Sequence, residues 1–103
     1  MDFRGPASPV GTLPSPEDLR VAPGERAGEM LLRWQRLPGA RTYRIEYTSD
    51  TTASATWLSG GLTTKAKASV TGLTSGTNYR FRVAGIAAAG QGAWSEEITK
   101  FAS

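Results

Sequence analysis

The chain of 103 residues is long enough for one small domain, and 12 lysines and arginines against nine aspartates and glutamates give it a formal charge of +3. It contains neither cysteine nor histidine, which excludes disulfides, zinc sites built from these residues and catalysis through a thiolate or an imidazole. The basic residues are spread along the chain and no apolar run reaches the length of a membrane span, so we expect neither nucleic-acid binding nor membrane insertion.

Residues 1–16 contain four of the six prolines. Proline cannot donate to a sheet ladder, so we expect an extended linker or tail here, followed by one domain over residues 17–103. The alternative is a first edge strand in which Phe3, Val10 and Leu13 pack against the domain. The segment lacks the apolar stretch of a signal peptide, and the localisation stays open. An extracellular or cell-surface place within a larger protein is favoured.

Seven short segments follow, in which apolar and polar residues alternate between turns rich in glycine and proline. Alternation with a period of two is typical of half-buried antiparallel strands. The expected strands cover residues 17–22, 29–37, 41–49, 56–61, 65–73, 78–86 and 94–101. Since no window supports an amphipathic helix, the sequence predicts an all-β, seven-stranded, two-sheet immunoglobulin-like sandwich. The side chains expected in its core are Trp34, Tyr43, Ile45, Tyr47, Leu73, Tyr79, Phe81 and Val83.

Leu73, Gly76 and Tyr79 follow one another at a spacing of three residues, where the chain must cross from one sheet to the other. Glycine permits the positive φ that a tight crossing needs. A tyrosine at the start of the next strand buries its ring, and its hydroxyl reaches back to an upstream backbone group. This arrangement predicts a tyrosine corner.

Several features in the same order resemble a fibronectin type III domain over residues 16 to about 101. They are Pro16 and Leu19 near the first strand, Trp34 in the second, the stretch 43–47, the corner at 73–79 followed by Phe81 and Val83, and the stretch 90–95. The alanine- and glycine-rich run before Trp94 resembles bacterial members of the family. The resemblance implies the fibronectin type III topology and a place in a larger protein. The adhesive Arg-Gly-Asp tripeptide of the family does not occur in this chain.

No residues converge into a catalytic or cofactor-binding site, so we expect no enzyme, no cofactor and no metal. Glu96 and Glu97 are adjacent in an expected strand, which would point their side chains to opposite faces and prevent them from acting as an acid/base pair. Serines and threonines are plentiful, but no base is placed to activate one of them.

Arg80 and Arg82 face outward on one expected strand, and two interpretations stay open for them. Beside Arg44 and Glu46 on one side and Glu97 on the other, they can form a mixed-charge ladder across the sheet. They can also form a basic patch for an acidic partner or a polysaccharide.

Other candidates for a binding surface are Trp57, on a short edge segment, and Gly90, Gln91 and Gly92, in an expected loop over residues 87–93. We expect Trp57 and Trp94 to serve packing, with Trp94 covering the end of the sandwich. Lys65 and Lys67 are expected to discourage pairing at an exposed sheet edge.

The sequence therefore favours a monomeric, non-catalytic module, a spacer or protein-interaction domain in a larger bacterial protein, whose partners are the neighbouring domains. The first alternative is a module that binds a carbohydrate or a protein through the face around Arg80 and Arg82 or through the loops. The second alternative is a structural component of a phage or virion.

Overall fold

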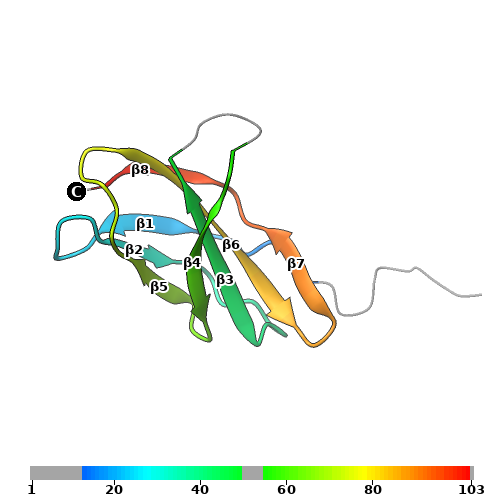
Figure 1. Cartoon of the computed structure of the whole chain (residues 1–103). Coiled ribbons are helices and arrows are strands. Elements are labelled where there is room, and N and C mark those ends of the chain that lie inside the picture. The colour runs from blue at the N-terminus through cyan, green and yellow to red at the C-terminus, as the bar shows by residue number, and fades with distance from the viewer. Residues whose placement is uncertain (1–12, 50–54, 103) are drawn as a thin grey trace, which may run out of the picture.

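The computed structural model describes residues 13–49 and 55–102, which form strands, turns and loops (Figure 1). The strands are β1 (Arg20–Pro23), β2 (Met30–Arg33), β3 (Thr42–Thr48), β4 (Leu58–Thr63), β5 (Lys67–Val70), β6 (Asn78–Ala87), β7 (Gly90–Trp94) and β8 (Ile98–Phe101). Within these ranges, no helix is long and apolar enough to cross a membrane.

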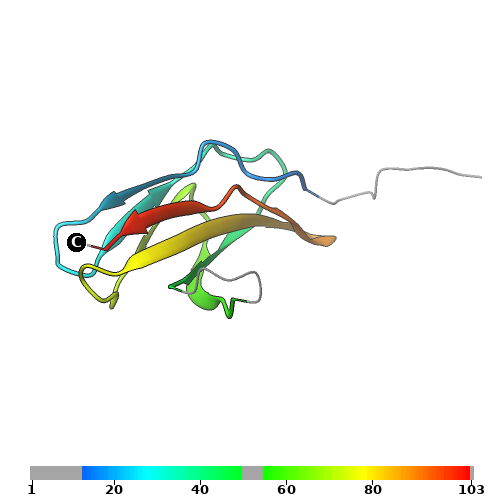
Figure 2. The ribbon, with the colours of Figure 1, turned by 90° about the horizontal axis from the view of Figure 1, so that it is seen from above.

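Two antiparallel sheets lie face to face (Figure 1, Figure 2). The small sheet has the strand order β1-β2-β5, and the large sheet has the order β4-β3-β6-β7, with β8 also paired to β6. Consecutive β1 and β2 pair directly, whereas β5 reaches β2 only after β3 and β4 have crossed to the large sheet. The predicted all-β, two-sheet sandwich is confirmed.

The structure has eight strands in the described residues, where the sequence predicts seven, because an additional strand, β7, forms mostly within the expected loop and ends where the last expected strand begins. Ser95 interrupts the ladder: its amide donates to the Val83 carbonyl (2.7 Å), and its hydroxyl accepts from the Val83 amide (3.0 Å). A side-chain acceptor here replaces a backbone one, so the chain leaves the ladder over residues 95–97 before β8 begins. The loop expected over residues 87–93 is accordingly much shorter, since β7 begins at Gly90.

The core lies between the sheets and follows the alternation of β6. Tyr79, Phe81 and Val83 point inward from this strand, and the latter two have no exposed surface. Trp34 is buried directly after β2 and packs edge-on against Tyr43, with ring centroids 5.3 Å apart. The other buried side chains of the central cluster are Leu19, Val21, Met30, Leu32, Ile45, Val70, Leu73 and Ala102, with Tyr47 partly buried against them.

The segment before β1 packs on the domain from Leu13 onward. Leu13 is buried, and its carbonyl accepts a hydrogen bond from the Ala93 amide (3.2 Å). Gly92 lets the two segments approach, since a Cβ atom there would collide with the Leu13 carbonyl oxygen. The edge-strand interpretation also named Phe3 and Val10, which lie outside the described residues. A linker role for residues 1–16 stays a prediction.

The crossing before β6 is held by hydrogen bonds at both ends. Gly76 has a φ of 79°, and its amide donates to the Ala102 carbonyl (2.8 Å). The Tyr79 hydroxyl accepts from the Thr74 amide (2.9 Å), while the Tyr79 ring is buried. Tyr79 therefore ties the crossing to the core through both its ring and its hydroxyl.

We predict that Tyr79→Phe lowers the free energy of unfolding by about 1–3 kcal/mol, because it removes the acceptor of the Thr74 amide and keeps the ring. Tyr47→Phe is the matched control, since the Tyr47 ring packs 6.0 Å from that of Tyr79 and its hydroxyl has no recorded hydrogen bond within the described residues. Urea denaturation measures both. Equal losses in the two variants would contradict the role assigned to the Tyr79 hydroxyl.

Candidate functional site

The outer face of the large sheet carries the residues that the sequence singled out. Because Tyr79, Phe81 and Val83 point into the core, Arg80 and Arg82 must point outward. The register places Glu46 of β3 directly opposite Arg82. Opposite charges therefore meet across these two strands.

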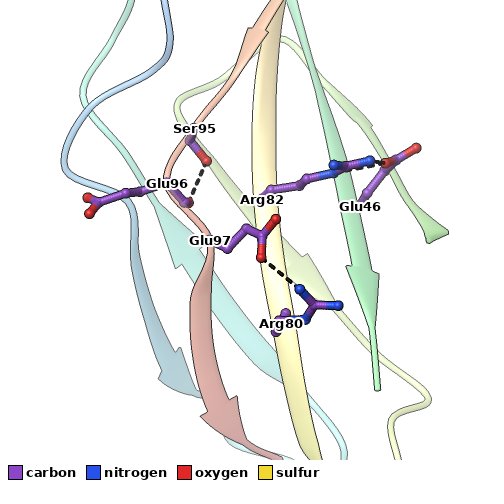
Figure 3. Close-up of polar contacts among 6 residues, drawn as sticks. All are labelled: Glu46, Arg80, Arg82, Ser95, Glu96 and Glu97. Carbon is purple, nitrogen blue, oxygen red and sulfur yellow. Dashed lines mark hydrogen bonds and ion pairs between the residues drawn. The ribbon is translucent and has the colours of Figure 1, made fainter. Parts of the chain in front are cut away.

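Arg82 lies between two indole rings. Its Cζ atom is 4.0 Å from the ring centroid of Trp57 and 4.1 Å from that of Trp94. Its Nε and Nη2 atoms both donate to Oε1 of Glu46, at 3.1 and 2.5 Å (Figure 3). Cation–π attraction is strongest where the cation is desolvated, and the Arg82 side chain is only 20% exposed. We call these residues, Trp57, Arg82, Trp94 and Glu46, the Arg82 stack.

Arg80 extends the same arrangement. Its Cζ atom lies 5.1 Å from the Trp57 ring centroid, and its Nη1 atom donates to Oε1 of Glu97 (2.9 Å; Figure 3). The side chain of Arg80 is 18% exposed. Trp57 thus contacts both arginines, and each arginine has a carboxylate of its own.

Trp94 differs from its expected position over the end of the sandwich. It ends β7 opposite Ala84 of β6, and its ring lies on the outer face of the sheet beside Arg82. This position follows from Ser95, which holds the end of β7 against Val83 and so aligns Trp94 with the outward side of β6.

The remaining candidates lie apart from the Arg82 stack or at its edge. Arg44 lies on β3 opposite Leu62 of β4 and Ala84 of β6, and its Nε atom is buried without a hydrogen-bond partner in the described part of the chain. Gly90 and Gln91 are exposed near the distant end of β6, and Gly92 lies against the segment at Leu13. The structure therefore brings Arg80, Arg82 and Trp57 together but leaves the glycine segment elsewhere.

The carboxylates do not form a metal-binding group in the residues described. Glu96 and Glu97 point apart, although they lie in the connection between β7 and β8 rather than in one strand (Figure 3). Over residues 13–49 and 55–102, no three acidic side chains gather to hold a metal ion.

A second polar surface lies on the outer face of the small sheet, and the sequence did not indicate it. Arg33 of β2 lies opposite Lys67 of β5, beside the exposed side chain of Leu31. From the sequence, Lys65 and Lys67 are expected only to discourage pairing with another strand at an exposed sheet edge. Residues 34–66 separate these two strands in the chain, so their register cannot be deduced from the alternation within each strand, and this register is what brings the cations together.

Comparison with known proteins gives the family of this sandwich. Residues 14–101 match the family model of the fibronectin type III domain. The chain belongs to the fibronectin type III domain family. Its members are generally non-catalytic modules, and they occur as parts of larger, multidomain proteins.

Solved structures share this fold at low sequence identity. An Fn3-like protein from Clostridium thermocellum is 20% identical with a TM-score of 0.73, over 85% of this chain and 91% of that chain. The FN5 domain of Drosophila Lar is 21% identical with a TM-score of 0.68, over 88% and 97%. A twitchin kinase region from C. elegans is 18% identical with a TM-score of 0.74, over 88% of this fibronectin type III domain and 17% of that chain. A search of the curated proteins finds no match.

We predict that Arg82→Lys lowers the free energy of unfolding of this fibronectin type III domain by about 1–2 kcal/mol. The planar guanidinium stacks between two rings while it donates two hydrogen bonds to one carboxylate. The ammonium group of lysine is not planar and cannot do both. The control is Arg36→Lys in the exposed loop after β2, which should change the free energy of unfolding by less than about 0.5 kcal/mol. Urea denaturation measures both, and a neutral Arg82→Lys would contradict a stabilising role for the stack.

Proposed function

We propose that this fibronectin type III domain is a non-catalytic spacer that connects neighbouring domains of a larger protein. The observation that carries the proposal is the position of the chain ends of the packed body. The described chain begins near β7 and finishes near the start of β6, at the opposite end of the sandwich (Figure 2). Domains attached before and after it would therefore lie on opposite sides.

Strand β6 runs along the long direction of the sandwich and sets the distance between the two chain ends (Figure 2). Strand β6 has ten residues, which at the usual rise of a strand span about 33 Å. The strand pairs with β3 over seven residues and with β7 and β8 on its other side. A strand paired on both sides resists bending, which is what a spacer requires.

Both ends of the packed chain are tied to the body by backbone hydrogen bonds. At one end the Ala93 amide donates to Leu13 (3.2 Å). At the other end the Ala102 amide donates to the Thr77 carbonyl (2.9 Å). The described residues next to both chain ends are thus fixed to the sandwich.

Binding through the face around Arg80 and Arg82 receives less support, because their charges are already paired with Glu97 and Glu46. An external carboxylate or sulfate would have to displace an internal carboxylate from each arginine. A bacterial source, a monomeric state and a place in a virion all stay predictions.

The spacer role predicts a fixed distance between the two ends. The chain has no cysteine, so Ser15→Cys and Lys100→Cys introduce the two thiols needed for spin labels. Electron–electron double resonance should give one narrow distance, unchanged when folded marker domains are fused to both ends. The pair Ser15→Cys and Arg36→Cys, which lie together at one end, is the control for label mobility. A broad distance distribution for the first pair beside a narrow one for the control would contradict a rigid spacer.

A further inference from the structure

Three cationic side chains form a row across the outer face of the small sheet. Arg20 of β1 lies opposite Arg33 of β2, and Arg33 lies opposite Lys67 of β5. Like charges directly opposite one another on neighbouring strands destabilise a sheet. The row therefore costs the domain stability.

The charges of this row are largely uncompensated. Arg20 has the Asp18 carboxylate at 3.8 Å, but both side chains are well exposed, at 78% and 65%, so the pair is weak. Over residues 13–49 and 55–102, no ion pair is recorded for Arg33, Lys67 or the nearby Lys65. The large sheet shows the opposite arrangement, since each outward arginine of β6 has its own carboxylate.

The row borders a hollow with an apolar side chain in it. The hollow has a volume of about 380 Å³, and its lining includes Leu31, Arg33, Lys65 and Lys67. Leu31 is 42% exposed, although its neighbour Leu32 is fully buried. We call the site formed by Leu31, Arg33, Lys65 and Lys67 the cationic hollow.

We propose that the cationic hollow binds an extended acidic segment of a partner polypeptide. Leu31 and Arg33 are two residues apart on β2, so their side chains lie on one face about 6.8 Å apart. In an extended partner segment, side chains two residues apart also lie on one face and have this same spacing. It can place a carboxylate on Arg33 and an apolar side chain on Leu31, while further carboxylates reach Lys65 and Lys67. This surface goes beyond the spacer role, which does not require it.

The composition of the hollow favours a polypeptide over a polysaccharide or a nucleic acid. Sugar rings and bases are usually held by stacking on aromatic side chains. Trp34 lines an adjoining hollow together with Arg33, Lys65 and Lys67, but it is only 6% exposed. An exposed leucine beside three cations instead matches an extended polypeptide that carries acidic and apolar side chains on one face.

The test uses a fluorescently labelled ten-residue peptide in which every second residue is in turn glutamate and leucine, with serine between them, so that acidic and apolar side chains share one face of the extended segment. It is titrated with the whole chain and followed by fluorescence anisotropy. We expect saturable binding that Arg33→Glu combined with Lys67→Glu weakens at least tenfold. The matched control combines Arg26→Glu with Lys100→Glu, which makes the same change in net charge at exposed sites away from the hollow. This control should weaken binding less than threefold.

Three results would overturn the proposal. The first is an equal loss of affinity in both double variants, which would indicate a diffuse effect of net charge. The second is tighter binding of heparin or single-stranded DNA than of the peptide, with the same dependence on Arg33 and Lys67. The third is no binding of the peptide at any concentration tested while circular dichroism shows a folded chain.

A second readout needs no ligand. Lys67→Glu turns the like-charge pair with Arg33 into an attractive one, so we expect it to raise the midpoint of thermal unfolding at low salt. Lys100→Glu on β8 is the control and should not raise it. An unchanged or lowered midpoint for Lys67→Glu would overturn the claim that the row is held at a cost to stability.

Discussion

The alternation of strand β6 is the constraint on which the rest of the domain depends. Its inward residues, Tyr79, Phe81 and Val83, supply the centre of the core, and this requires Arg80 and Arg82 to face outward. Two adjacent cations on a sheet would repel each other, but the register brings Glu46 and Glu97 to them. Trp57 and Trp94 then cover the arginines, so segments before β4 and at the end of β7 are held to the same strand.

The two sheets therefore use their outward charges in opposite ways. On the large sheet, opposite charges face one another and indole rings cover them, so these charges contribute to the fold. On the small sheet, Arg33 and Lys67 face each other beside an exposed leucine, and neither has an ion pair in the part of the chain that the structure describes. A pair of like charges that lowers stability points to a role other than folding, because a surface that serves only folding does not need such a pair. This contrast, more than the net charge, indicates which face is available to a partner.

Local patterns in the sequence were sufficient for the fold class, because alternation and turn residues depend on near neighbours alone. The outward side of β6 also follows from alternation. Three features could not be predicted, because each depends on contacts between distant segments. The break at Ser95 arises from its bonds to Val83, the position of Trp94 follows from that break, and the meeting of Arg33 with Lys67 is set by the register of β2 with β5.

The arginines of β6 are occupied within the domain, whereas Arg33 on the small sheet has no ion pair among the described residues, and this difference can be measured. Nuclear magnetic resonance of the arginine Nε–H groups tests it directly. The Arg82 group, bonded to Glu46, should exchange slowly with water and stay unshifted when the glutamate–leucine peptide is added. The Arg33 group should exchange fast and respond to the peptide. A fast-exchanging Arg82 that shifts with the peptide, beside an unresponsive Arg33, would contradict the account.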